Sequence, residues 1–159
     1  MPIIRQGSIP SETGSNYPAP HNDGLGDYEA WPLSDAGGLT QFGAFVEKLY
    51  PGAVSSHRHW HDNEDEFVYL LEGEVVLVDD DGEHAMSPGD AATFRAGVAN
   101  GHQLRNRSDR PAMYVVVGTR LPEDRCHYSD IDMLLTRTAD SRRFTRRDGS
   151  PLPGADDAG

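Results

Sequence analysis

Three histidines occupy alternate positions in the stretch SSHRHWHDNEDEF, namely His57, His59 and His61. In an extended strand, side chains two residues apart point to the same face, so neighbouring imidazoles here can reach one metal ion. Imidazole and carboxylate groups are donors that bind divalent transition metals. Acidic residues follow directly, at Asp62, Glu64, Asp65 and Glu66. The stretch is therefore either part of a metal site or a solvated polar loop.

The other ligands of such a site must come from other strands. Glu66 opens the apolar run EFVYLL and can supply an oxygen from the strand that follows the histidines. His102 lies in the polar stretch NGHQLRN, after the turn at Gly97 and far along the chain. An antiparallel barrel brings such distant strands together. His102 is accordingly the candidate for a fourth ligand.

Short β-strands separated by turns are typical of the segments around these residues. Residues 42–49 alternate and are rich in β-formers, which predicts a strand before the turn at Pro51 and Gly52. Asp81 and Gly82 predict a tight hairpin after a short apolar strand. Continued along the chain, the pattern gives roughly seven or eight strands with a turn every ~8–12 residues, and at most one short helical turn. This spacing fits an antiparallel sandwich or barrel.

The chain has 159 residues, which is enough for one domain with one core. Residues 1–38 are rich in Gly, Pro, Ser and Asn and predict an irregular N-terminal arm. Residues 39–137 hold the predicted barrel. Residues 138–159 begin with a basic cluster and end in a Pro/Gly/Asp tail that we expect to be partly disordered.

Charge and composition exclude several classes of protein. A net charge of −12 disfavours binding to nucleic acid or to an anionic membrane surface. Cys126 is the only cysteine, so no intrachain disulfide can form. The N-terminus lacks an apolar core of signal-peptide length, and no apolar run of about 18 residues occurs. We therefore expect a cytoplasmic protein.

Two motifs resemble those of the cupin superfamily. The first, HWHDNEDEFVYLLEG, has the cupin spacing of H-x-H, four residues, Glu, six residues and Gly, with His59, His61 and Glu66 in the ligand positions. The second, GDAATFRAGVANGHQLRN, places His102 in the remaining ligand position. It departs from the family pattern in two ways, because Arg95 replaces a proline and the gap between glycine and histidine is longer by two residues.

The resemblance implies an all-β fold, the antiparallel double-stranded β-helix or jelly-roll barrel, with His59, His61, Glu66 and His102 as metal ligands. It implies one divalent transition metal ion per chain (Fe, Mn, Zn, Ni, Co or Cu), acting as a Lewis acid or as an oxygen-activating centre on a small polar metabolite. The chain is most similar in pattern to small bacterial single-domain cupins, some of which carry sugar phosphate isomerase or dioxygenase labels. Isomerase, lyase and dioxygenase chemistry all stay open, as does a non-catalytic small-molecule-binding module or sensor.

Residues near these motifs have competing interpretations. His57 falls outside the motif spacing, so it is either a residue at the barrel rim or a group that binds substrate or shuttles protons near neutral pH. Trp60 is expected to pack on the outer face of its strand. Cys126 beside His127 resembles a nucleophile pair, but adjacency alone supplies no geometry. We also expect a homodimer, with the N-terminal arm adding a strand to a partner's exposed sheet edge.

Overall fold

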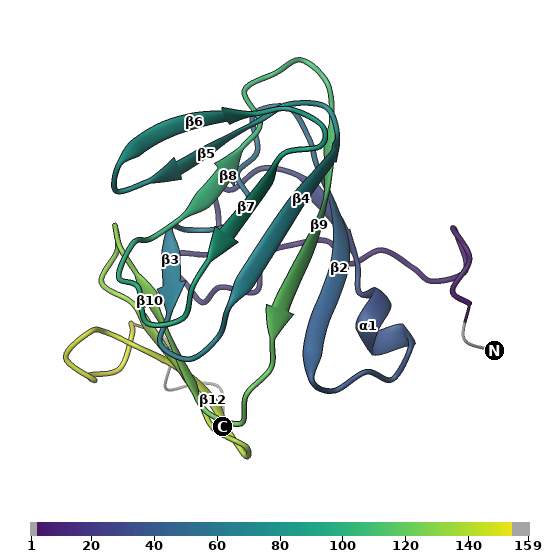
Figure 1. Ribbon diagram of the computed structural model, residues 1–159. Coiled ribbons are helices and arrows are strands. Elements are labelled where there is room, and N and C mark those ends of the chain that lie inside the picture. Colours follow the sequence, from purple (N-terminus) through teal and green to yellow (C-terminus); the bar gives the residue numbers. More distant parts are fainter. Residues whose placement is uncertain (1–2, 154–159) are drawn as a thin grey trace.

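Antiparallel strands make up almost all regular structure in the computed structural model, which describes residues 3–153 (Figure 1). The described residues form twelve strands and one helix of four residues. The elements are β1 (Tyr28–Trp31), α1 (Leu33–Ala36), β2 (Phe42–Leu49), β3 (His59–His61), β4 (Glu66–Glu72), β5 (Val75–Asp79), β6 (Gly82–Met86), β7 (Ala91–Phe94), β8 (Gln103–Arg105), β9 (Ala112–Thr119), β10 (Asp124–Tyr128), β11 (Leu134–Arg137) and β12 (Arg142–Thr145).

The largest sheet has the strand order β1-β2-β9-β4-β7, and all its pairings are antiparallel. Along β4, Val68 and Leu70 point inward and are buried, while Phe67, Tyr69 and Leu71 on the other face are exposed. The inward side chains join residues from β2, β5 and β9 in one hydrophobic cluster. Period-two alternation in the sequence thus gives this sheet one core face and one outer face.

Two smaller sheets close the other side of the barrel and position the predicted ligands. One has the order β12-β11-β10-β3, and the other β6-β5-β8. Strand β3 pairs with β10 so that His61 lies opposite Cys126, and His59 lies opposite Tyr128. This arrangement of antiparallel sheets is the jelly-roll barrel that the sequence predicts.

The strand boundaries agree with most sequence expectations and correct two of them. The described residues hold more strands than the seven or eight expected, because several are only three to five residues long. The β5–β6 turn is centred on Asp80 and Asp81, since Gly82 already pairs with Asp79. The described residues contain no helix long and apolar enough to cross a membrane.

The structure adds detail to the predicted division into arm, barrel and tail, which stays a prediction. The arm contains β1 and α1, and Glu12 forms an antiparallel bridge with Ala30 of its own chain. The tail contains β12 and the buried Leu152. Residues 154–159, where we expected disorder, lie outside the described residues. The described part of the arm thus lies against its own barrel.

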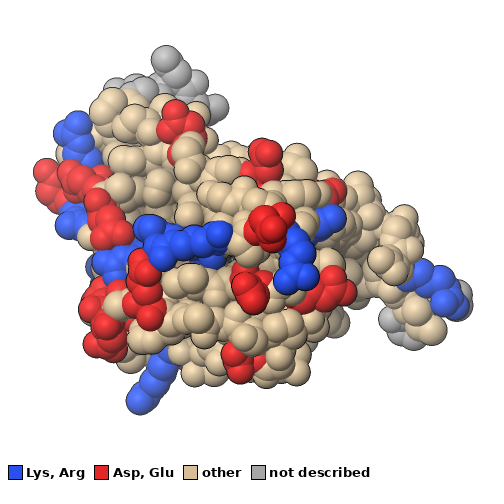
Figure 2. Space-filling view, turned by 90° about the horizontal axis from the view of Figure 1, so that it is seen from above, with Lys and Arg blue, Asp and Glu red and all other residues tan. Residues whose placement is uncertain are grey.

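Acidic and basic side chains are interspersed on the face that Figure 2 shows. Lys and Arg side chains there lie among Asp and Glu side chains and form no continuous basic surface. Ion pairs on the surface of the molecule join Arg58 to Asp80 and Asp130, and Arg107 to Glu83.

Candidate metal centre

Two imidazoles from β3 form one side of the candidate metal centre. His59 and His61 point to the same face, with ring centroids 5.3 Å apart. Trp60 points to the other face and stacks on the ring of His127 at 4.0 Å. The alternation expected for a strand therefore holds in β3, and Trp60 packs against a neighbour as predicted.

The other two predicted ligands meet these imidazoles at one carboxylate oxygen. Glu66 opens β4, and its Oε2 lies 3.6 Å from Nε2 of His59 and 3.7 Å from Nε2 of His61. His102 is held beside β3 by a bridge to His59, and its Nε2 lies 2.8 Å from the same oxygen. All four residues predicted as ligands thus come together.

Hydrogen bonds to the far side of two rings prepare them to bind a cation. Nδ1 of His59 lies 2.9 Å from the backbone carbonyl of His57, and Nδ1 of His61 lies 2.6 Å from Oδ2 of Asp124. A proton on each Nδ1 satisfies both acceptors and leaves a lone pair on each Nε2. Carboxylate or carbonyl partners of this kind are typical of metal-binding histidines.

Unpartnered polar atoms also indicate that a cation fits this cluster. Among the described residues, Oε2 of Glu66 and Nδ1 of His102 are the buried side-chain polar atoms that lack a hydrogen-bond partner. Oε2 of Glu66 is close to Nε2 of His102, but the two atoms do not align as a hydrogen bond. Burying an unsatisfied carboxylate oxygen is costly, and a divalent ion beside it would remove that cost. The residues present therefore fit a divalent metal ion.

The electrostatics of the cluster show close coupling between the imidazoles and the carboxylate. Burial alone lowers the pKa of His59, but the nearby carboxylate of Glu66 outweighs it and raises the pKa to about 9. Burial likewise opposes the proton on His61, while Asp124 and Cys126 raise its pKa to about 10. Burial raises the pKa of Glu66, yet His102 and His59 hold it well below its usual range. Burial lowers the pKa of His102.

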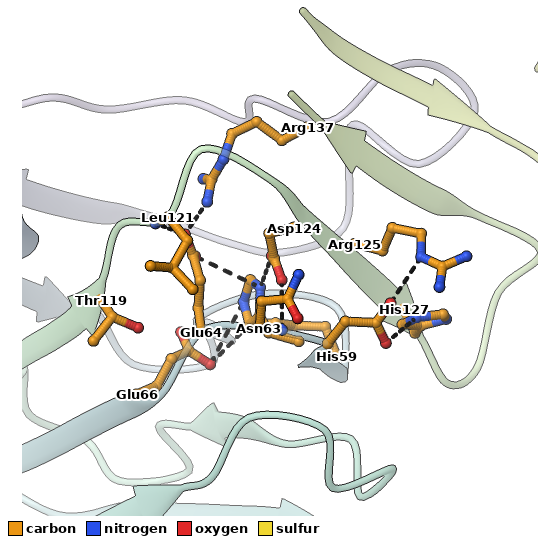
Figure 3. A network of polar contacts seen from close by, with 12 residues as sticks. His59, Asn63, Glu64, Glu66, Thr119, Leu121, Asp124, Arg125, His127 and Arg137 are labelled. Atoms are coloured by element: carbon orange, nitrogen blue, oxygen red, sulfur yellow. Dashed lines mark hydrogen bonds and ion pairs between the residues drawn. The ribbon is translucent and has the colours of Figure 1, made fainter. Parts of the chain in front are cut away.

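Sequence reasoning missed Asp124, which orients His61. The carboxylate is 5% exposed, and its Oδ1 also accepts the backbone N–H of Asn63. Asp124 therefore links β10 to the loop that follows β3 (Figure 3). The only signal in the sequence was an aspartate at the start of a strand, which does not identify its partner 63 residues away.

Asp62 and Glu64 are not solvated loop residues, which corrects the sequence-based interpretation, whereas Asp65 is exposed as that interpretation expects. Glu64 is 8% exposed, forms an ion pair with Arg137 of β11 and accepts the backbone N–H of Leu121 at 3.2 Å (Figure 3). Asp62 binds Arg125 at 2.7 Å and His127 at 2.9 Å. The loop is held in place because β10 and β11 supply cationic side chains to its carboxylates, and Leu121 before β10 supplies a backbone N–H.

Cys126 lies beside the imidazoles and does not face His127. Adjacent residues of β10 point to opposite faces, so His127 stacks on Trp60 while Cys126 faces His61. The donor atoms of Cys126, His59 and His61 lie within 4.8 Å of one another. The thiol–imidazole pair that sequence adjacency suggests therefore does not form. Cys126 is instead a buried neighbour of the candidate metal centre, where sequence reasoning did not place it.

His57 lies beside the cluster and is covered by the N-terminal arm. Its Nε2 donates to the backbone carbonyl of His21 at 2.9 Å, and the ring of Tyr17 lies 4.7 Å away. It does not share the oxygen of Glu66 with the other imidazoles. Its role in substrate binding stays a prediction.

A cavity of about 510 Å³ opens onto three of the four ligands. His61, Glu66 and His102 line it, together with residues of β5, β6 and β7. Glu64 and Arg95 also line it. A ligand of metabolite size can therefore reach the cluster from this side.

A family model and several solved structures are similar to this chain. Residues 45–118 match the family model described as "Cupin domain". No curated protein matches. The chain is similar to the crystal structure of a sugar phosphate isomerase from a cupin superfamily, from Silicibacter pomeroyi, at 50% identity and a TM-score of 0.92, over 96% of this chain and 98% of that one.

Two further structures are more distant. A candidate sugar phosphate isomerase from Acidithiobacillus ferrooxidans is 26% identical, with a TM-score of 0.73, over 80% of this chain and 81% of that one. A predicted oxalate decarboxylase from Thermotoga maritima is also 26% identical, with a TM-score of 0.62, over 75% of this chain and 99% of that one. The motifs, the barrel and the extensive match to the Silicibacter pomeroyi protein together show that this chain belongs to the cupin superfamily.

Proposed function

We propose that the chain is a metal-dependent enzyme that isomerises a small phosphorylated sugar. One observation carries the metal part of this proposal. Three imidazole Nε2 atoms lie within 3.7 Å of one buried carboxylate oxygen, and two of the rings are fixed through Nδ1. The similarity to two proteins described as sugar phosphate isomerases supports the substrate class.

The donor set determines what chemistry a bound metal supplies. A divalent ion held by His59, His61, Glu66 and His102 would act as a Lewis acid toward substrate oxygen atoms. Three neutral imidazoles and one carboxylate leave about one positive charge on such a site, which favours an anionic or enolisable oxygen ligand. This charge suits the hydroxyl and carbonyl oxygens of a sugar phosphate.

Other residues of the chain would bind the substrate and move its proton. Arg95 lines the metal-side cavity and supplies a guanidinium that can pair with a phosphate. Glu64 is the carboxylate of the preceding loop that lines this cavity without being a proposed ligand. Its position makes it the candidate acceptor for a proton taken from the substrate carbon. Asp124 would keep the ring of His61 in place during these steps.

Metal content is the first test of this proposal. Protein purified without chelator or added metal should contain about one equivalent of a transition metal per chain, and the His59→Ala/His61→Ala double variant should lose it. A His57→Ala/His84→Ala double variant removes the same number of imidazoles outside the ligand set and should keep its metal. No metal in the wild-type protein, even after reconstitution, would contradict the ligand assignment.

The bound metal then selects the assay. Manganese, zinc, nickel or cobalt would lead to NMR screens for aldose–ketose interconversion with phosphorylated sugars. Iron would favour the second candidate, a dioxygenase-like reaction, and would lead to oxygen-consumption screens. Binding of a sugar phosphate without turnover under any metal would favour a non-catalytic binding module.

A further inference from the structure

A second cavity lies beneath the N-terminal arm and shares no lining residue with the metal-side cavity. Its volume is about 340 Å³. Strands β1 and β2 line one side, Tyr128 of β10 and Arg142 of β12 line another, and Tyr17 of the arm contributes to its wall. The cavity thus lies among elements that already surround the metal centre.

The carboxylate of Glu47 is a buried polar group in the lining of this cavity. Glu47 is 7% exposed, and its Oε1 accepts a hydrogen bond from the hydroxyl of Tyr114 at 2.5 Å. Among residues 3–153, no group donates a hydrogen bond to Oε2 of Glu47. This oxygen is not among the unpartnered atoms that are fully enclosed by protein. Oε2 therefore remains available to a molecule inside the cavity. A carboxylate kept in such a place without an ion pair needs an explanation beyond folding.

The rest of the lining indicates what kind of molecule fits. Phe45, Tyr17, Tyr28 and Tyr128 provide aromatic surface beside the carboxylate. A carboxylate beside aromatic rings can accept hydrogen bonds from hydroxyl groups while the rings cover C–H surface. The guanidinium of Arg142 lies 4.9 Å above the ring of Phe144, where it can meet an anionic group.

The cavity also reaches close to the metal centre. The ring centroid of Tyr128 lies 6.1 Å from that of His59. Ser55 lines the cavity, and its neighbour Ser56 lies 3.2 Å from Nδ1 of His59. Only one layer of side chains therefore separates this cavity from the proposed ligands.

We propose that the cavity beneath the arm is a binding site for a polyhydroxylated small molecule with an anionic group, in which Glu47 accepts hydrogen bonds from the hydroxyls and Arg142 pairs with the anion. The two cavities have no lining residue in common, so this site is separate from the cavity that opens onto the metal ligands. The choice of sugar phosphates as probes rests on the proposed function.

Binding at Glu47 should be linked to release of a proton. Burial raises the pKa of Glu47 to about 7, although the hydrogen bond from Tyr114 partly opposes this. Hydroxyl donors favour the ionised carboxylate, so a bound ligand lowers this pKa and expels the proton.

Other titratable groups at the cavity should not contribute at neutral pH. Burial raises the pKa of Tyr17, Tyr28, Tyr114 and Tyr128, so these phenols stay neutral. Arg142 and Arg120 supply the guanidinium groups of the lining, and Arg120 is paired with Asp35 at 2.6 Å. Glu12, from the arm, is the remaining carboxyl of the lining and is exposed.

Isothermal titration calorimetry at about pH 7, in two buffers of different ionisation enthalpy, tests the proposal. The probes are glucose 6-phosphate, ribose 5-phosphate, free glucose and inorganic phosphate. At least one sugar phosphate should bind the wild-type protein and release a fraction of a proton. Glu47→Gln should weaken binding about tenfold or more. It should also reduce proton release to the part that comes from the probe's own phosphate, and free glucose should then release none. Arg142→Ala should weaken binding of phosphorylated probes more than binding of glucose.

Glu29→Gln is the matched control. Glu29 also accepts a tyrosine hydroxyl, that of Tyr50 at 2.6 Å, but it lies outside this cavity. This variant should bind and release protons like the wild type. If Glu47→Gln fails to fold by circular dichroism, Arg142→Ala still tests the site, because Arg142 is exposed on β12.

The outcomes separate this inference from the proposed function. Absence of binding by all four probes, or unchanged binding and proton release in Glu47→Gln, would overturn the inference. The His59→Ala/His61→Ala variant should keep both binding and proton release if the cavity is a separate site, and their loss would overturn that assignment. Binding that depends on Glu47, without turnover of any sugar phosphate, would contradict the proposed isomerase and support the inference.

Discussion

Asp124 provides the most direct test of how single residues prepare the metal centre. Its Oδ2 lies 2.6 Å from Nδ1 of His61 and fixes both the proton position and the ring orientation. Asp124→Asn should weaken metal binding by roughly 10–100-fold, because the amide accepts the proton less strongly and no longer supports the imidazole's basicity. Competition with a chromophoric chelator measures this change.

Asp62→Asn is the matched control for Asp124. Asp62 also pairs with a histidine, His127, at 2.9 Å, but His127 is not a proposed ligand. This variant should bind metal as tightly as the wild type. Equal affinities for all three proteins would contradict the role assigned to Asp124.

Glu47 should make the stability of the protein depend on pH. Burial raises its pKa from 4.5 to about 7, so between these values the folded chain holds a proton that the unfolded chain has lost. Since the folded state binds more protons there, the free energy of unfolding falls as pH rises through this window, by up to about 3 kcal/mol from this group. Urea unfolding of wild type and Glu47→Gln across this range measures the difference.

The comparison between variants isolates Glu47 from other titrating groups. Glu47→Gln keeps an acceptor for the hydroxyl of Tyr114 but cannot ionise, so its stability should fall less steeply with pH. Glu29→Gln should follow the wild-type slope in this window. Parallel curves for wild type and Glu47→Gln would show that Glu47 is ionised at neutral pH in the folded protein.

The pairing of β11 with the loop after β3 should contribute to stability at the scale of elements. Arg137 of β11 is the ion-pair partner of Glu64, whose carboxylate is buried. Arg137→Met leaves that carboxylate without its cation, and we expect a loss of about 1–3 kcal/mol, a range reduced because the arginine is partly exposed. Thermal unfolding of metal-free protein measures it.

Arg143→Met on the neighbouring strand β12 is the control for this contact. Arg143 is exposed and should contribute little. A separate chelator competition with both variants would follow metal affinity, because Oε2 of Glu64 lies 3.9 Å from Nδ1 of His61. An equal effect of the two substitutions would show that the pair with Glu64 adds nothing to stability.

The sequence predicts the metal ligands better than it predicts the residues that orient them or that hold the neighbouring loop. His59 and His61 are recognisable because strand alternation places them on one face, and Glu66 and His102 follow from motif spacing. Asp124 and Arg137 reach the site only through the register of β10 on β3 and of β11 on β10. Nothing local in a sequence determines such pairings, and the same holds for the burial of Glu64.

The outer face of the largest sheet bears on the assembly of the whole molecule. Phe67, Tyr69 and Leu71 alternate along β4, and each is between 38% and 41% exposed. Phe42 at the start of β2 is 39% exposed. Strand alternation places the three β4 side chains on one face, away from the core. Apolar patches of this kind on a protein surface mark sites of association.

We propose that a second copy of this chain covers this face. The homodimer would then form through the outer face of the sheet and not through addition of the N-terminal arm to a partner's sheet edge. The described arm pairs with β1 of its own chain through Glu12 and Ala30, so its strand-forming residues are already engaged. A sheet face that exposes several large apolar side chains suits a two-fold interface between copies. Light scattering coupled to size exclusion should give about twice the chain mass of 17.4 kDa.

Charged substitutions on the outer face of β4 should separate the two copies. Phe67→Lys/Leu71→Lys introduces like charges facing each other across a two-fold axis, together with a cost for burying them, and should yield a mass near that of one chain. Both side chains point away from the core, so the variant should keep its fold and its metal. Ile3→Lys/Val98→Lys, which charges two exposed apolar positions outside β4, should remain dimeric. A wild-type mass of one chain, or a dimer that withstands the β4 substitutions, would exclude this face as the interface.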